Sequence, residues 1–502
     1  MTIRLEHNSG TPLYQQIVEQ VRAMVLNGTL PAGYRLPPER KLADALSVNR
    51  TTILNAYREL KAEGLIGSHV GQGTVVLAAQ ESESTPPATA SRPIWSHYLS
   101  DYAGQFSQFQ MNDLLDFANR TDVISFATGM AAPECGPAEA LRGIEERVLT
   151  EDGGQYLMHS PVEGFHSLRV EIAGYMSQRG AYCTPGEVFV TSGSQQGIEL
   201  VAQALLNPGD IVVMEEPTYF PAIQVFKAMG ARIMGVPVDE EGMQLSVLEL
   251  LLQRYRPKLI YTVPTFHNPT GTELSMERRK WLMALSRQYR IPVVEDDAYG
   301  ELRYDGTALP TLKSMDSAGL VIHLNTFSKM IYPGLRIGWV VADRKLVDTL
   351  IAIRQVVDIH TNCLSQKIVE RFVASGQLGT HLETVTKAYR HKRDTMLRAL
   401  RQYAPEGMRW TTPAGGYYIW VTLPPGVACD KLLHRAERHK VAFVPGTLFS
   451  TTGQETGRMR LNFTFAAEHQ IEPGIRRLCE AIRETVAQEP EGAPLVERNP
   501  IV

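Results

Sequence analysis

The chain has few cysteines and no long hydrophobic run. Its 502 residues include five cysteines, without a C-x-x-C pair or a spacing typical of a metal site. This pattern predicts reduced thiols in a cytoplasmic protein and no bound metal. The first ten residues are polar, and no run approaches the roughly 18 apolar residues of a membrane span. The sequence therefore predicts neither a signal peptide nor a membrane segment.

Charge of either sign is also not in large excess. The net charge is −4, and charged residues make up 21% of the chain. This balance excludes a chain dominated by polyanion binding, but it leaves room for one small DNA-binding module. A hydrophobic content of 44% is ordinary for a globular protein, and the length predicts about three domains.

Residues 1–77 read as a self-contained unit. Apolar residues recur every three or four positions in three stretches, and a glycine-rich tip joins two β-prone pieces. Helix, helix, short turn, helix and hairpin is the order of a winged helix-turn-helix. The predicted elements are helices from Pro12 to Asn27, from about Leu36 to Leu46 and from Arg50 to Glu63, and β-prone pieces at residues 65–68 and 74–77.

Several segments of this unit resemble the GntR-type winged helix: residues 12–17, 33–43, 49–52 and 71–74. Pro38 and Asn49 stand where that family usually has serine, and Asn49 can still cap the third helix. The resemblance implies that the third helix enters the major groove of DNA, with its first turn facing base edges.

Basic and hydroxyl side chains of this unit are the candidate DNA contacts. Arg50 would pair with a guanine, and Thr51 and Thr52 would meet phosphate or a thymine methyl. Arg40 would hold a phosphate. The candidates are Arg35, Arg40, Arg50, Thr51, Thr52 and, at the wing tip, Gly73. The unit carries eight Lys and Arg against six Asp and Glu, a weak basic excess, so a protein-interaction module remains the alternative.

Two further domains follow a linker. Residues 78–95 are small, polar and proline-rich, which predicts a semi-extended linker. Residues 96–357 would form a large α/β domain with a helical start, and residues 358–490 a smaller α+β domain before a tail at 491–502. Short β-rich runs alternate with helical stretches in the large domain, which predicts a mostly parallel sheet with helices on both faces. The runs are residues 187–191, 210–215, 231–237, 258–263, 292–295, 320–324 and 338–341, and then 408–413, 415–422, 441–445 and 459–464 in the smaller domain.

The loop after the run 320–324 combines a lysine with phosphate-binding side chains. Ser328 and Lys329 are adjacent, and Arg336 follows. A buried ammonium is costly without a partner, whereas a lysine that forms a Schiff base becomes a covalent anchor. The trio suits an aldehyde cofactor that carries a phosphate, with Lys329 on the carbonyl. A surface loop with ordinary basic residues is the alternative.

Other strand ends carry polar and aromatic side chains. Residues 191–197 run from a strand into a helix, and backbone N–H groups there form an anion site. Tyr219 follows the next strand, with a place in the core as its alternative. Asn268 offers an amide to a phenolic oxygen. Asp296 and Asp297 end another strand, where two buried acids need a cation partner such as a pyridinium nitrogen.

Residues 123–465 resemble the class I/II aminotransferases of fold-type I, which use pyridoxal 5′-phosphate. The resemblance implies that Lys329 is the Schiff-base lysine, that Asp296 keeps the ring nitrogen protonated, and that Tyr299 and Asn268 bond the ring 3-oxygen. It also implies ring stacking by Tyr219, phosphate contacts from Gly193, Ser194, Gln195, Ser328 and Arg336, a contact of Tyr156 with the partner subunit's phosphate, and a carboxylate clamp at Arg460. A solvated arginine at a strand end is the alternative for Arg460.

A GntR-type winged helix joined to an aminotransferase-like domain is the layout of the MocR-type transcription regulators, which this chain resembles. The resemblance implies a homodimer, often domain-swapped, that binds operator DNA. It also implies an amino compound or the cofactor itself as effector, sensed by aldimine exchange at Lys329. The alternative is a working aminotransferase that acts on an amino acid, because every expected catalytic position is intact.

Overall fold

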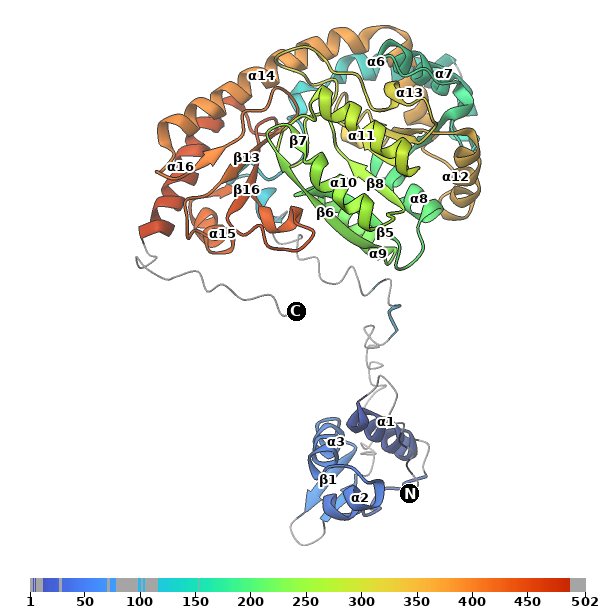
Figure 1. Cartoon of the computed structure of the whole chain (residues 1–502), viewed down its shortest axis with the longest axis vertical. Helices are drawn as coiled ribbons and strands as arrows, with labels where there is room; N and C mark the ends of the chain where they lie inside the picture. Colours follow the sequence, from blue (N-terminus) through green and yellow to red (C-terminus); the bar gives the residue numbers. More distant parts are fainter. Residues whose placement is uncertain are drawn as a thin grey trace. The chain divides into compact units, whose positions relative to one another are not determined.

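Two units make up the part of the chain that the computed structural model describes, which is residues 3, 5, 12–26, 29–69, 73–77, 98–100, 103, 116–151 and 153–487. The units are Met1–Tyr98 and Leu99–Val502, drawn in Figure 1. The predicted linker at 78–95, the tail at 491–502, residues 70–72 of the glycine-rich wing tip and most of the predicted helical start of the second domain lie outside the described residues. No helix in the described ranges is long and apolar enough to cross a membrane.

The first unit contains the predicted helices and hairpin. Its elements are α1 (Leu13–Leu26), α2 (Glu39–Leu46), α3 (Arg50–Ala62), β1 (Ile66–His69) and β2 (Gly73–Val76). The helices bury the residues that recur in the sequence, among them Ile17, Val21 and Ile53. Ile66 faces Val76 in the antiparallel hairpin. The order is that of a winged helix-turn-helix, as predicted.

The start and end of α3 follow from local chemistry. The Asn49 side chain accepts a hydrogen bond of 3.0 Å from the Thr51 backbone N–H, which confirms the predicted N-cap. After the helix, Gly64 takes a φ of +71°, a backbone conformation that glycine adopts without strain. These two residues fix where the third helix begins and ends.

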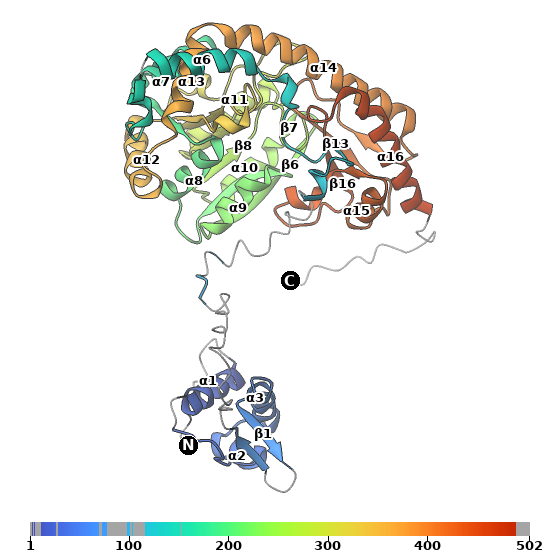
Figure 2. The same cartoon turned by 180° about the vertical axis from the view of Figure 1, so that it is seen from behind.

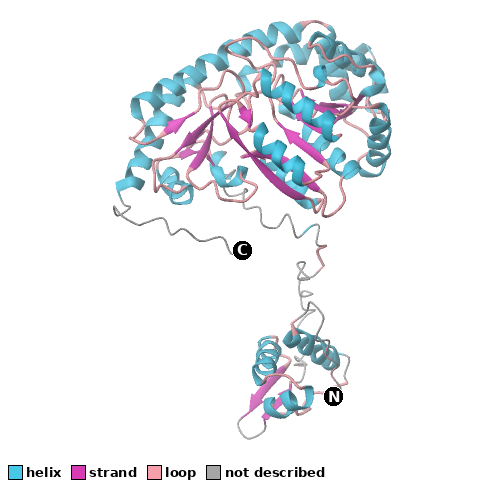
Figure 3. Ribbon diagram, in the orientation of Figure 1, coloured by secondary structure: helices cyan, strands magenta, loops and turns pink. Residues whose placement is uncertain are grey.

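The second unit is built on an eight-stranded sheet, visible in Figure 3. Its strand order is β4-β11-β10-β9-β8-β5-β6-β7. β11 runs antiparallel to β10 and β4, β7 runs antiparallel to β6, and the other pairs are parallel. The strands are β4 (Val188–Thr191), β5 (Ile211–Glu216), β6 (Arg232–Asp239), β7 (Gly242–Met243), β8 (Leu259–Thr262), β9 (Val293–Asp296), β10 (Val321–Thr326) and β11 (Gly338–Val341). The mostly parallel α/β sheet is the predicted one, and the short β7 was not predicted.

Alternate residues of this sheet face opposite helical layers. Val212 and Met214 pack among residues of one layer, α8 (Ser194–Leu205), α9 (Phe220–Ala228) and α12 (Arg344–Val357). Val213 lies between them in sequence and packs with the other layer, α10 (Leu245–Arg254) and α11 (Met276–Tyr289). Around β4 and β11, the helices α6 (Ala138–Glu151), α7 (His166–Gln178) and α13 (Cys363–Ala374) contribute a third cluster. The period of two residues places a hydrophobic layer on each face.

A smaller sheet lies beside the large one, as Figures 1 and 2 show. Its order is β12-β13-β16-β15, all antiparallel. The elements are β12 (Arg409–Trp410), β13 (Tyr418–Thr422), β15 (Val444–Pro445) and β16 (Arg458–Asn462), with α14 (Gln377–Tyr403), α15 (Cys429–Arg438) and α16 (Glu468–Ala487) packed on them. This is the predicted α+β region.

The run at 441–445 is not one strand, as was predicted, but two. β14 (Val441–Ala442) pairs in parallel with β3 (Ile124–Ser125), and β15 pairs with β16. The predicted strand at 415–422 also begins late, at Tyr418. A Cβ at Gly415 would lie 2.3 Å from the Phe266 ring, and Gly416 has a φ of +73°. Gly415 pairs with Arg303 instead of with β16, so the strand begins after the two glycines.

Candidate functional site

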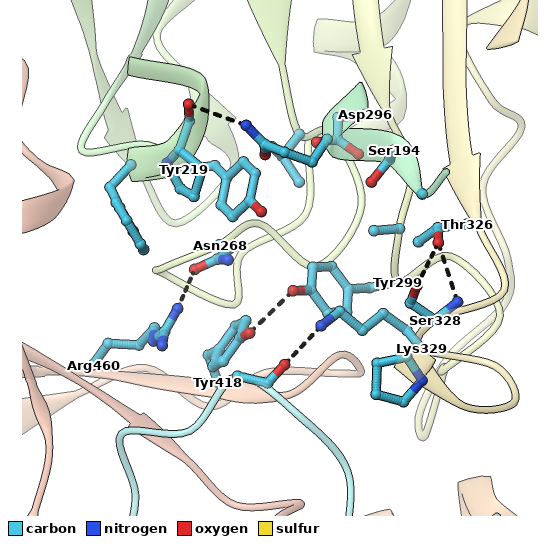
Figure 4. Close-up of a pocket in the computed structure, with 18 of the residues that line it drawn as sticks. Ser194, Tyr219, Asn268, Asp296, Tyr299, Thr326, Ser328, Lys329, Tyr418 and Arg460 are labelled. Atoms are coloured by element: carbon cyan, nitrogen blue, oxygen red, sulfur yellow. Dashed lines mark hydrogen bonds between the residues drawn. The ribbon is translucent and has the colours of Figure 1, made fainter. Parts of the chain in front are cut away.

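A cavity of about 300 Å³ opens where strands of the large sheet end. The carboxyl ends of β4, β5, β8, β9 and β10 all deliver side chains to it, as expected of an open α/β sheet. The smaller sheet supplies Tyr418, Val444 and Arg460. Figure 4 shows the convergence of these side chains. The predicted residues that line the cavity are Gly193, Ser194, Gln195, Tyr219, Asn268, Asp296, Tyr299, Ser328, Lys329, Arg336 and Arg460.

Lys329 lies just beyond β10 and reaches back across the cavity. Its Nζ donates a hydrogen bond of 2.6 Å to the carbonyl oxygen of Gly129. Burial lowers the pKa of the Lys329 amine, and the cations Arg460 and Arg336 lower it further. A lysine with a lowered pKa is a better nucleophile at neutral pH, because more of it is uncharged.

Asp296 ends β9 and is buried. Its Oδ2 accepts a hydrogen bond of 2.7 Å from the Tyr261 hydroxyl, and its Oδ1 has no partner among the described residues. Burial raises the pKa of Asp296 to about 6, although the Tyr261 hydrogen bond opposes that shift. The neighbouring Asp297 pairs instead with Arg179, at 2.6 Å. Asp297 therefore has a cationic partner within the protein, Arg179, which was not predicted. Asp296 keeps one carboxylate oxygen without a partner among the described residues.

An anion site is formed where β4 turns into α8. Gly193 is the N-cap residue of α8, with a φ of +87°. Because glycine has no side chain to cap the helix, the first backbone N–H groups of α8 remain available to bind an anion. A Cβ on Gly193 would lie 2.5 Å from Nη2 of Arg336. Arg336 also approaches Ser328 Oγ at 3.5 Å. Ser194 lines the same part of the cavity. The donors suit a dianion.

Aromatic and amide side chains line the space between Asp296 and the smaller sheet. Tyr299 and Tyr418 are joined hydroxyl to hydroxyl at 3.1 Å. Asn268 Oδ1 accepts a hydrogen bond of 3.0 Å from Arg460 Nη1. Tyr219 is held in the cavity wall, and burial raises the pKa of its hydroxyl. These groups surround a space that has the Asp296 carboxylate on one side and the Tyr299 and Tyr418 hydroxyls on another.

Arg460 is buried and fixed on several sides. Its Nη2 donates to the carbonyl oxygen of Ala127 at 3.0 Å. The guanidinium carbon lies 4.2 Å from the centre of the Tyr418 ring and 4.9 Å from that of Phe449. The solvated arginine considered from the sequence is excluded, because only 4% of this residue is exposed. Its Nε has no partner among the described residues, so donors remain for a ligand carboxylate.

Tyr156 does not line this cavity. It belongs to a short helix (Gly153–Leu157), with its ring 5.4 Å from that of Phe165 and with Lys367 Nζ 5.0 Å from the ring centre. Gly129, Tyr261 and Tyr418 are among the residues at the site that were not predicted. Tyr418 follows a double glycine and a second tyrosine on a predicted strand, and that pattern is a usable signal. The parts played by Gly129 and Tyr261 depend on a backbone carbonyl and a strand neighbour, which the sequence does not mark.

Comparison with known proteins agrees with this geometry. Residues 121–482 match the family "Aminotransferase class I and II". The chain belongs to that family. Residues 13–76 match "Bacterial regulatory proteins, gntR family". This member of the aminotransferase family therefore has a GntR DNA-binding domain at its N-terminus, and the predicted fusion is confirmed.

Relatives of two kinds resemble this aminotransferase-family chain. Aromatic-amino-acid aminotransferase 1 of Thermococcus litoralis is 40% identical over 78% of the chain and 95% of its own length. The uncharacterized HTH-type transcriptional regulator YisV of Bacillus subtilis is 30% identical over 95% of the chain and 97% of its own length. The relative named as a regulator thus spans both domains, whereas the aminotransferase spans the second.

Solved structures extend the likeness to the fold. A multiple substrate aminotransferase from Thermococcus profundus has a TM-score of 0.76 and 39% identity, covering 79% of this chain and all of its own. The α-aminoadipate aminotransferase LysN of Thermus thermophilus, complexed with N-(5′-phosphopyridoxyl)-L-leucine, has a TM-score of 0.74 and 36% identity, covering 78% and 99%.

Pyridoxal 5′-phosphate is the cofactor of this family, and the residues present fit it. The partnerless, buried Oδ1 of Asp296 suits a protonated ring nitrogen. The open start of α8, with Arg336 and Ser328 beside it, suits the phosphate. The Lys329 amine suits the aldehyde carbon. The predicted cofactor is thereby confirmed at the level of the family.

The first unit presents its candidate DNA contacts at the start of α3 and around the hairpin. The side chain of Arg50 is 69% exposed and approaches Glu39 Oε2 at 3.4 Å. Such a surface pair is weak, so a phosphate or base can replace the carboxylate. The Thr51 hydroxyl donates to Asn49 Oδ1, and Thr52 is half-buried. Arg35, Arg40 and Gly73 are exposed. The backbone of Arg35 pairs in antiparallel fashion with that of Val75 on β2.

Proposed function

We propose that the chain is a transcription regulator of the MocR type, which binds operator DNA in the cytoplasm and senses an amino compound or the cofactor in the Lys329 cavity. The observation that carries the proposal is the presence, in one chain, of a recognition helix with an exposed start and a cavity lined by Lys329, Asp296 and Arg336. A winged helix serves no purpose in an enzyme that only transaminates. The relative YisV, which is named as an HTH-type regulator, covers 95% of the chain, which supports the same assignment.

The cavity residues divide the work of binding. Lys329 would hold the cofactor covalently, and the amine of a bound ligand would displace the Lys329 side chain from the cofactor. Asp296 would keep a proton on the ring nitrogen, while Tyr299 and Asn268 would bond the ring 3-oxygen. The bound cofactor supplies an electron sink. Tyr219 would stack on its ring, and Gly193, Ser194, Gln195, Ser328 and Arg336 would hold its phosphate.

Arg460 would clamp the carboxylate of the amino compound with two parallel hydrogen bonds. The guanidinium is already oriented by two aromatic rings and two acceptors, so little side-chain freedom is lost when a carboxylate binds. The effector would thus be an amino acid rather than a simple amine.

DNA would be bound by the first unit. Arg50, at the start of α3, would read a guanine, and Thr51 and Thr52 would contact phosphate or a thymine methyl. Arg40, Arg35 and the wing at Gly73 would hold the backbone. The functional form would be a homodimer, with Tyr156 completing the partner subunit's phosphate site and with the first unit exchanged between subunits.

Footprinting on the DNA upstream of its own gene tests the proposal. Protection of a defined operator, altered by an amino acid in the presence of pyridoxal 5′-phosphate, is the expected result. Steady-state transamination assays on the same preparation test the second candidate, a working aminotransferase. That candidate is supported by the intact cavity and by the 40% identity to the Thermococcus litoralis enzyme. Rapid turnover without any footprint would overturn the regulator assignment.

A further inference from the structure

The cavity wall next to Arg460 is apolar. Ala127, Phe220 and Val444 line the cavity there and belong to one hydrophobic cluster with Trp420 and Phe449. Val444 stands opposite Arg460 on the neighbouring strand, and Ala127 accepts a hydrogen bond from the same guanidinium. We name Ala127, Phe220 and Val444 the apolar wall. A ligand whose carboxylate is held by Arg460 has this wall beside it.

The charged side chains of the cavity already have roles. Among the described residues that line it, the charged ones are Asp296, Lys329, Arg336 and Arg460. Asp296, Lys329 and Arg336 face the cofactor's ring nitrogen, aldehyde and phosphate under the proposed function. Arg460 is then the one cation left for the ligand, and no acid is left for it. A second carboxylate or an ammonium on the ligand would be buried against the apolar wall without a partner, which is strongly unfavourable.

We infer that the effector is a monocarboxylic α-amino acid with an apolar side chain, of the size of leucine or phenylalanine. The inference rests on the proposed function and specifies the ligand of that site. The carboxylate binds Arg460, the amine faces the Lys329 end of the cavity, and the side chain packs on Ala127, Phe220 and Val444. Each CH₂ group buried there strengthens binding about fourfold.

The same cluster reaches the part of the chain that follows the linker. Ala118 is buried in it and Phe117 packs against it, and these residues come just before β3. A side chain that binds on the apolar wall therefore adds to the packing that holds residues 117 and 118. An apolar effector would therefore pack on the same cluster as Phe117 and Ala118, which a ligand held by its charges alone would not.

Titration of the full-length, cofactor-loaded protein tests the ligand class. The change in cofactor absorbance gives a dissociation constant for each of L-leucine, L-phenylalanine, L-alanine, L-glutamate and L-lysine. Leucine and phenylalanine should bind at least about tenfold tighter than alanine, and glutamate and lysine should bind no tighter than alanine. Glutamate or lysine binding as tightly as leucine would overturn the inference.

A substitution in the wall separates side-chain recognition from carboxylate binding. Val444→Thr exchanges a methyl for a hydroxyl at nearly constant volume, so leucine affinity should fall about fivefold or more while alanine affinity stays the same. Val373→Thr, a half-buried position on α13 that does not line the cavity, is the matched control and should change neither. Val444→Ala removes methyl groups without adding a polar atom and should act in the same direction. Equal leucine affinities for wild type and both Val444 variants would contradict the wall assignment.

Footprinting on the same preparations separates this inference from the proposed function. A footprint with a preference for glutamate refutes the apolar effector and leaves the regulator standing. A preference for leucine without any footprint upholds the ligand class and refutes the regulator.

Discussion

Tyr261 on β8 donates a hydrogen bond of 2.7 Å to Asp296 on β9. Both side chains are buried, and the bond engages one carboxylate oxygen while the other faces no protein donor. Because the hydroxyl stabilises the charged carboxylate, it acts against the burial that raises the pKa of Asp296. Tyr261 thus positions Asp296 and keeps it available as an anion.

Tyr261→Phe should weaken cofactor binding roughly tenfold, since one hydrogen bond to a charged group contributes about 1.5 kcal/mol. The neutral form of Asp296 would be favoured, and it binds a protonated ring nitrogen poorly. Spectral titration of the cofactor-free protein with pyridoxal 5′-phosphate measures the effect. Tyr289→Phe, a half-buried position on α11, should bind like wild type. Equal affinity in Tyr261→Phe would show that the bond does not tune the site.

Stability of the cofactor-free protein should depend on the ionisation of Asp296. Its pKa of about 6 in the fold exceeds the value of about 3.9 in an unfolded chain. The carboxyl group therefore contributes stability that is fully present below about pH 4 and is lost as the pH rises through about 6. Asp296→Asn removes this dependence on pH. As the pH rises from about 4 through about 6, the free energy of unfolding of the wild type should therefore fall by up to about 3 kcal/mol relative to that of the variant. Thermal unfolding at a series of pH values tests this, with Asp430→Asn on the exposed side of α15 as control. Parallel pH profiles for wild type and Asp296→Asn would contradict it.

The fold was largely predictable because its elements bury continuous or periodic apolar runs. The β5 run, for example, alternates between two helical layers, and a strand buried on both faces reads as unbroken hydrophobic sequence. β7 and the separation of β14 from β15 were not predictable. Each of these elements has only two residues, and their pairing depends on distant chain segments that a local pattern does not contain.

Lys329→Ala should leave the protein folded and able to bind DNA, but without covalent cofactor. The phosphate-binding groups at α8 and Arg336 remain, so weaker noncovalent binding should persist. Borohydride reduction followed by peptide mapping should place a pyridoxyl adduct on Lys329 in wild type and none in the variant. Lys280→Ala, exposed on α11, should be labelled like wild type. An adduct on another lysine would falsify the assignment.

Arg50→Ala should cost about 1–3 kcal/mol on the operator and relax specificity at one base pair. Arg40→Ala should weaken specific and non-specific DNA alike, because a phosphate contact carries no sequence information. Arg58→Ala, exposed further along α3, serves as control for the loss of charge alone. Gel shifts at fixed salt measure all three. Unchanged operator affinity in Arg50→Ala would refute the base contact.

Assembly is tested by light scattering on the cofactor-loaded protein at micromolar concentration, where a dimer mass is expected. Tyr156 packs on Phe165 within its own subunit, away from the cavity that it would serve in a partner. Tyr156→Phe should therefore lower cofactor affinity while leaving the dimer mass unchanged. A monomer that retains cofactor would contradict the shared site.

The candidate site shows where prediction from sequence stops. Residues such as Asp296 and Arg336 were predicted because the resemblance assigns them a chemical task. Gly129 was not, because its part is a carbonyl oxygen bonded to Lys329 Nζ, and any residue supplies a carbonyl. Arg179 was not predicted either, since its partner Asp297 lies far away in sequence and no local spacing connects them.

The parallel pairing of β3 with β14 has a mechanical consequence. β3, which follows residues 116–120, pairs with β14 just before β15 in the chain. The backbone N–H of Asn462 on β16 donates a hydrogen bond to the carbonyl oxygen of Phe126, which directly follows β3. Three residues later, Gly129 holds the Lys329 amine. The segment that follows residue 116 is therefore held by β14 and by β16, the strand that carries Arg460, and β3 does not pair with the eight-stranded sheet. Residues 126–129 therefore bond through their backbone carbonyls to the strand of Arg460, to the Arg460 guanidinium and to the Lys329 amine, so one short segment connects the carboxylate clamp with the lysine.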